Sequence, residues 1–152
     1  MSHVTATELE GRSLSALRAA VVAMGGQFME GQKTFRWYGQ FLNDWDSGRA
    51  AVNQGYDAKT FGKCTHAIRI PGHKSGNYEI GVQVKPDGTF TLIYDTWSSG
   101  GEAIEKAYGK DASLLKAHYG AQVSAQELKR KGYAVTHEVD EFGRPRVVGR
   151  KA

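Results

Sequence analysis

Chemistry at a metal ion is the first possibility that the spacing of side chains raises. Cys64 and His66 are two residues apart, and His73 follows in a glycine-flanked loop. Because side chains on a strand alternate with period two, Cys64 and His66 would share one face. Zinc takes three or four such ligands, and Asp57 is the only further donor nearby in the sequence. We therefore expect a structural thiol and imidazole here, with no metal and no cofactor.

Phosphoester chemistry is the second possibility. The triplets His3-Val4-Thr5 and His73-Lys74-Ser75 have the pattern by which two-histidine phosphoesterases place an acid and a base about one phosphate. His3 lies at the terminus and His73 in a loop, which disfavours a shared site. The spacing of a nucleotide-binding loop and the G-x-S-x-G elbow of serine hydrolases are both missing. We predict no catalytic residue, and a histidine- or metal-dependent phosphoesterase is only a distant alternative.

A cluster of cations near the C-terminus is the third possibility. The formal net charge is +4, and residues 112–152 hold eight basic and four acidic side chains, whereas residues 1–111 are balanced. The cations that could follow a phosphate backbone are Lys129, Arg130, Lys131, Arg144, Arg146, Arg150 and Lys151. Cations in a last helical turn also complement the helix dipole, and charged termini keep proteins soluble. Nucleic-acid binding by this basic C-terminal edge, residues 129–152, is therefore an alternative function.

Aromatic side chains are concentrated between Phe35 and Phe61. Such rings suit the centre of a protein interface, but they suit a hydrophobic core equally well. The candidates for contact with a partner are Trp37, Tyr38, Trp45 and Trp97. The sequence leaves both interpretations open.

The elements that must position these residues begin with a strand, "SHVTATEL", and a helix with Ser13 at its N-cap. The helix carries apolar residues at three- and four-residue spacing and ends at Gly25-Gly26. A short apolar piece, Gln27 to Glu30, follows, and residues 32–63 show no assignable period. The centre is clearer, because "THAIRIP" predicts a strand, and "NYEIGVQV" and "TFTLIYDTW" predict a hairpin around Lys85-Pro86-Asp87-Gly88. Alternation places Ile80 and Val82 on the core face and Glu79 and Gln83 on the other.

The C-terminal third predicts a short helix over 102–108 and a longer one, capped by Asp111 or Ser113, that runs to about Lys131. Gly132 stands at its C′ position, and "YAVTHEV", "DEFG" and "RPRVVGR" then read as a terminal hairpin. The order of elements predicts an α+β fold with a two-layer arrangement, in which a mostly antiparallel sheet packs against two or three helices. At 152 residues, the chain 1–152 fits a single domain.

Composition narrows the class of protein. The sequence is 40% hydrophobic and 24% charged, which is typical of a folded globular chain. No apolar run approaches the length of a membrane span, and the N-terminus lacks the order of a signal peptide. Cys64 is the single cysteine, which suits a reducing compartment. We expect a soluble, cytoplasmic protein without a membrane partner.

Several segments, taken in order, are similar to a known family. The opening "MSH", then "CTHAIRIPG", "YEIGV", "DGTFTLIYDTW", "GG" and "LLKAHYGAQVSAQELKRKGY" resemble the domain-of-unknown-function family numbered 1257. That family includes conserved reading-frame proteins of chloroplasts and cyanobacteria, with relatives in bacteria and phages. The resemblance covers nearly the whole chain and is most specific between Cys64 and Trp97. It implies no settled activity and no catalytic residues, and it suggests an accessory role beside an ATPase of the AAA type.

These observations favour a small non-enzymatic binding or adaptor protein that acts with a protein partner, which the resemblance suggests is an ATPase. Nucleic-acid binding through the C-terminal edge is the alternative, and formation of a homo-oligomer stays open. The identity of a partner and the convergence of His3, His66 and His73 cannot be read from the sequence.

Overall fold

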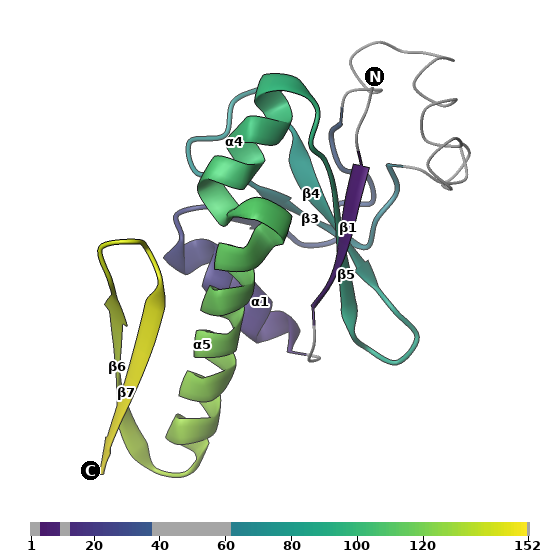
Figure 1. The fold of residues 1–152 in the computed structure, drawn as a ribbon. Coiled ribbons are helices and arrows are strands. Elements are labelled where there is room, and N and C mark those ends of the chain that lie inside the picture. The colour runs from purple at the N-terminus through teal and green to yellow at the C-terminus, as the bar shows by residue number, and fades with distance from the viewer. Residues whose placement is uncertain (1–3, 10–12, 38–61, 152) are drawn as a thin grey trace.

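The computed structural model describes residues 4–9, 13–37 and 62–151, which form an α+β fold as the sequence predicts (Figure 1). The strands are β1 (Val4–Leu9), β2 (Gln27–Met29), β3 (His66–Arg69), β4 (Glu79–Val84), β5 (Phe90–Asp95), β6 (Tyr133–Val139) and β7 (Pro145–Lys151). The helices are α1 (Leu14–Ala23), α4 (Ser98–Tyr108) and α5 (Ser113–Arg130), with a 3-10 turn at Lys110–Ala112. The first five strands form an antiparallel sheet in the order β1-β5-β4-β3-β2, and β6 and β7 form a separate hairpin.

One face of the five-stranded sheet carries the main core beneath the helices. Every second residue of a strand points to the same face, so β3, β4 and β5 supply a continuous apolar layer. Its fully buried side chains are Ile68, Ile80, Val82, Leu92 and Tyr94. They pack in one cluster with Leu17 and Val21 of α1, Ile104 and Tyr108 of α4, and Leu115 of α5. The predicted inward positions of Ile80 and Val82 are therefore confirmed.

Helix α1 begins where the sequence predicts. The hydroxyl of Ser13 accepts a hydrogen bond from the backbone N–H of Ala16 at 3.1 Å, which satisfies one of the free donors of the first turn. The helix ends at Met24, and Gly25 takes a φ of 83°, a left-handed value that favours glycine. Because β1 and β2 lie at opposite edges of the sheet, α1 connects one edge with the other.

Helix α4 begins at Ser98, four residues before the predicted start at 102, and so includes Gly100 and Gly101. These glycines are required by close packing and do not end the helix. A Cβ at Gly100 would lie 2.6 Å from ring carbons of Tyr78, and a Cβ at Gly101 would overlap the backbone of Thr96. The sequence pattern suggested a loop because it contains no signal for this packing.

Helix α5 differs from the prediction at its start. Its N-cap is Ala112, in the left-handed region at φ 57°, and no side chain caps the helix. The predicted caps, Asp111 and Ser113, were wrong, since the carboxylate of Asp111 accepts a hydrogen bond from the hydroxyl of Thr5. The end of the helix is as predicted, with Gly132 at φ 91°. None of the helices in the described ranges is long and apolar enough to cross a membrane.

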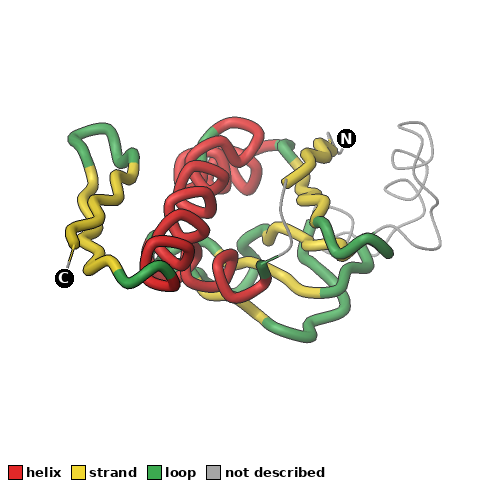
Figure 2. The backbone as a smooth tube through the Cα atoms, turned by 90° about the horizontal axis from the view of Figure 1, so that it is seen from below, coloured by secondary structure: helices red, strands yellow, loops and turns green. Residues whose placement is uncertain are grey.

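The terminal hairpin lies on the side of α5 that faces away from the five-stranded sheet (Figure 2). Its strands pair antiparallel, with Val135 opposite Gly149, as the alternating sequence predicts. Close packing fixes it on the helix, because a Cβ at Gly149 would lie 3.0 Å from a methyl group of Leu128. One imidazole nitrogen of His118, Nε2, is also hydrogen-bonded to the carbonyl oxygen of Gly143 at 3.0 Å.

The opposite face of the sheet is covered by the segment that follows β2. Phe35, Trp37, Cys64 and Ala67 form a second buried cluster there. Gly81 of β4 allows this contact, since a Cβ at that position would overlap the ring of Phe35. The second face is thus covered over β3 and β4, while Ala6 and Glu8 of β1 stay exposed, and it holds the pocket described below.

Candidate functional site

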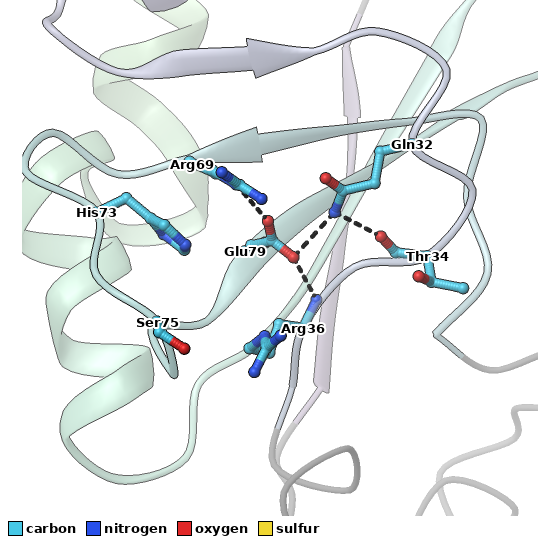
Figure 3. Close-up of a pocket in the computed structure, with 7 residues that line it drawn as sticks. All are labelled: Gln32, Thr34, Arg36, Arg69, His73, Ser75 and Glu79. Atoms are coloured by element: carbon cyan, nitrogen blue, oxygen red, sulfur yellow. Dashed lines mark hydrogen bonds and ion pairs between the residues drawn. The ribbon is translucent and has the colours of Figure 1, made fainter.

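A polar pocket of about 470 Å³ opens on the sheet face opposite the helices (Figure 3). Three elements meet around it: the segment after β2, the end of β3 with its following loop, and the start of β4. The lining side chains are Gln32, Thr34, Arg36, Arg69, His73, Ser75 and Glu79. Every one of them is polar or charged, so the pocket is suited to a polar ligand.

Glu79 is the centre of the hydrogen-bond network in this pocket. Its Oε2 accepts from Nε of Arg69 at 2.9 Å. Its Oε1 accepts from Nε2 of Gln32 at 3.0 Å and from the backbone N–H of Arg36 at 2.9 Å. Alternation had placed Glu79 on the face away from the main core, and it does lie there. It is nevertheless buried, because the segment after β2 covers that face, and sequence reasoning missed this role.

The described lining of the pocket includes two guanidinium groups, those of Arg36 and Arg69, and the carboxylate of Glu79. Both the side chain and the backbone carbonyl of Arg69 form hydrogen bonds. Its Nε is bonded to Glu79, and its backbone carbonyl accepts from the hydroxyl of Tyr108 on α4 at 2.6 Å. Its two terminal guanidinium nitrogens have no partner among the described residues. The pocket therefore presents positive charge and free donors at a fixed position.

His73 borders the pocket from the loop after β3. Its Nδ1 is buried and has no hydrogen-bond partner among the described residues. Burial lowers the pKa of His73, and the positive charge of Arg69 acts in the same direction, while Glu79 opposes them. The imidazole is therefore neutral at pH 7, with one nitrogen as donor and the other as acceptor. The predicted His73-Lys74-Ser75 triplet brings two of its members, His73 and Ser75, into this pocket.

Cys64 and His66, two of the residues considered for a metal site, have different hydrogen-bond partners. The thiol of Cys64 donates to the carbonyl of Gln32 at 3.2 Å, and burial raises the pKa of this thiol to about 11. His66 accepts at Nδ1 from the backbone N–H of Gly31 at 2.9 Å. In the described part of the chain, no three His, Cys, Asp or Glu side chains gather in a way that could hold a metal ion. His3 lies outside the described residues.

The basic C-terminal edge divides into two groups. Tyr133 pairs with Lys151, so the end of β7 lies beside the end of α5, and five cationic residues belong to these two ends, the base of the hairpin. They are Lys129, Arg130, Lys131, Arg150 and Lys151. The other two, Arg144 and Arg146, lie near the turn of the hairpin and pair with acidic neighbours at 2.8 Å and 3.9 Å. At the base, one carboxylate, Glu127, pairs with two of the five cations.

The aromatic candidates have different surroundings. Trp37 is buried in the second cluster, as in the hydrophobic-core interpretation that the sequence left open, and Trp97 is half-buried beside Asp95. Tyr38 and Trp45 lie outside the described residues. An exposed ring that we did not expect is Phe142, in the turn of the hairpin, with the guanidinium of Arg144 at 5.2 Å from its centre. The signal that was missed is an aromatic residue inside a polar turn, "DEFG".

Comparisons of this chain with protein-family models, with curated proteins and with solved structures found no match. The resemblance to the family numbered 1257 therefore stays a prediction.

Proposed function

We propose that the protein is a small, non-enzymatic, cytoplasmic binding protein that docks a protein partner through its terminal hairpin. The observation that supports this is an exposed apolar tip, where Val139 is 61% and Phe142 is 68% exposed. Aromatic rings at the surface are enriched at the centres of protein interfaces. In the described part of the chain, β6 and β7 pair only with each other, so each leaves an edge to which a partner strand could add.

The choice of partner and compartment follows from the sequence. The resemblance to the family numbered 1257 makes an ATPase of the AAA type the first partner to test. The lone cysteine, Cys64, suits the reducing cytoplasm. A second copy of the chain could also use the open strand edges, and the size of the recovered complex would show it.

The experiment is recovery of the tagged full-length chain from its host, with and without nuclease, followed by mass spectrometry. The double variant Val139→Asp with Phe142→Asp places two charges on the apolar tip. We expect it to lose the partner protein that the unchanged chain recovers in stoichiometric amount after nuclease treatment. Val22→Asp, at an exposed position of α1, adds one charge far along the chain from the tip and is the control. Retention of the same partner by the tip variant would contradict the proposed docking surface.

Nucleic-acid binding is the second candidate, and the five cations at the base of the hairpin favour it. Replacing Lys129, Arg130 and Lys131 by Glu should weaken binding of an oligonucleotide. It should also flatten the slope of log affinity against log salt by roughly 2 to 3, because about one counterion is released per phosphate contact. The same exchange at the exposed Lys74, Lys106 and Lys110 is the charge-matched control. Equal slopes for both variants would exclude this surface.

A further inference from the structure

The pocket on the second face of the sheet has three properties that point to one class of ligand. It is concave and polar, with a volume of about 470 Å³. Two guanidinium groups line it, and the carboxylate of Glu79 is already bonded to Arg69, Gln32 and the backbone of Arg36. The terminal guanidinium nitrogens of Arg69 have no partner among the described residues, so a ligand meets charged donors there.

The internal ion pair also positions a donor. Arg69 uses Nε for Glu79, which fixes the plane of the guanidinium and leaves its terminal N–H groups for a further acceptor. A planar guanidinium held in this way matches a carboxylate or a phosphate, since both offer oxygens at the spacing of its fork. Little rotamer entropy is lost on binding when the side chain is already fixed.

His73 gives an independent indication that something polar belongs in this space. Its Nδ1 is buried without a partner in the described ranges, and a buried polar atom of this kind is costly unless it forms a hydrogen bond. Figure 3 shows the imidazole pointing into the space that Arg69, Glu79 and Arg36 border. The hydroxyl of Ser75 lies on the same side of the pocket, two residues further along the loop.

We propose that this pocket binds an oxyanion, a phosphate or a carboxylate group, at the terminal guanidinium nitrogens of Arg69, with His73 and Ser75 as neutral donors. The volume exceeds that of the anion alone, so the pocket has room for a small organic molecule that carries the oxyanion at one end. The site is a binding site and requires no bond to be made or broken. The site does not involve the hairpin, so a negative binding result here would leave the proposed docking function unaffected.

The test is a titration of the full-length protein, followed by the backbone amide resonances, with sodium phosphate and separately with sodium acetate. Sodium chloride holds the ionic strength constant in both arms. We expect saturable shifts confined to residues 32–36 and 69–79. Saturation by phosphate alone identifies a phosphate group, and saturation by acetate identifies a carboxylate. The absence of saturable shifts in both arms would overturn the proposal.

Variants of the loop make the test specific. His73→Ala with Ser75→Ala removes two hydrogen bonds to a charged group, and we expect affinity to fall tenfold or more. Lys74→Ala, between them in the same loop but not in the lining, removes a charge and should change affinity little. Because Ser75 is exposed, Ser75→Ala alone preserves the fold if the double variant does not. Loss of affinity in Lys74→Ala but not in the other variants would also overturn the proposal.

Discussion

The pocket and the hairpin both join arginines to carboxylates, yet the two regions differ in what those pairs do. Arg69 and Glu79 are 2.9 Å apart, and the side chain of Glu79 is 4% exposed. Arg130 and Glu127 are closer, at 2.6 Å, but their side chains are 73% and 45% exposed. Water screens the exposed pair, whereas the buried carboxylate depends on its partners. Distance alone is thus a poor guide to the importance of an ion pair in this chain.

The two regions also differ in how they are assembled. The pocket joins segments that are more than forty residues apart, since Gln32 and Arg36 meet Glu79. The hairpin is local, because its strands are joined by a turn of a few residues. A substitution in the pocket should therefore affect the whole fold, and a change in the hairpin should stay local.

The largest expected effect comes from Glu79→Ala. It leaves Arg69 without its partner and removes the acceptor of Gln32 and of the N–H of Arg36, so we expect the free energy of unfolding to fall by about 3 kcal/mol. Denaturant unfolding measures this loss. Glu127→Ala, in the exposed pair, is the control and should leave stability nearly unchanged. Similar losses in the two variants would refute the distinction between the regions.

Removal of the hairpin is expected to cost less. A chain that ends at Gly132 exposes the parts of Leu114 and Leu128 that the hairpin covers, which should lower the free energy of unfolding by about 2 kcal/mol. The five-stranded sheet and its core do not include β6 or β7, so one cooperative transition should remain. Thermal unfolding by circular dichroism provides the check. A shortened chain without a cooperative transition would show that the hairpin is part of the main folding unit.

Tyr108→Phe tests the hydrogen bond that joins α4 to the backbone of the pocket residue Arg69. The lost hydroxyl leaves the buried carbonyl of Arg69 without its donor, and we expect a loss of about 1 kcal/mol in unfolding free energy. Tyr133→Phe in the hairpin is the matched control, because the hydroxyl of Tyr133 has no partner in the part of the chain that the structure describes. An equal change of unfolding free energy in the two variants would contradict a stabilising role for this hydrogen bond.

The smallest expected effect is a dependence of the folding stability on pH. The pKa of His73 is lowered in the folded state, chiefly by burial and then by Arg69 and Arg36, with Glu79 opposing. The unfolded chain therefore takes up a proton near the ordinary value of 6.5, before the folded chain does. Stability should fall as the pH drops from 7 through 6.5 towards the lower folded pKa. His73→Gln should reduce this dependence in a phosphate-free buffer, and an unchanged pH profile would contradict it. His66, whose pKa burial also lowers, contributes in the same direction.

Local patterns predicted most of the fold. Ser13 marks the start of α1, and Gly132 marks the end of α5, because caps depend on a few neighbouring residues. The turn between β4 and β5 follows from Pro86-Asp87-Gly88, with Gly88 at φ 88°. These signals lie within the elements that they define.

The pocket was not predicted, because its cause is tertiary. Alternation assigned Glu79 to the correct face, but the burial of that face depends on a segment forty residues earlier. The start of α4 was also missed, because the prediction placed Gly100 and Gly101 before the helix, whereas they lie inside it and permit contact with Tyr78 and Thr96. In both cases the tertiary packing that decides the outcome leaves no signal in the local sequence pattern.

The pairing of β1 with β5 has a consequence for how the chain folds. Val4 lies opposite Asp95, so one edge of the sheet joins residues that are about ninety positions apart. Closing so long a loop lowers the entropy of the chain before any stabilising contact has formed, so folds rich in such pairs form slowly. During synthesis, β1 and α1 emerge long before their partner strand exists. The hairpin of β4 and β5 should therefore nucleate the sheet, and the N-terminal strand should join it as one of the last steps.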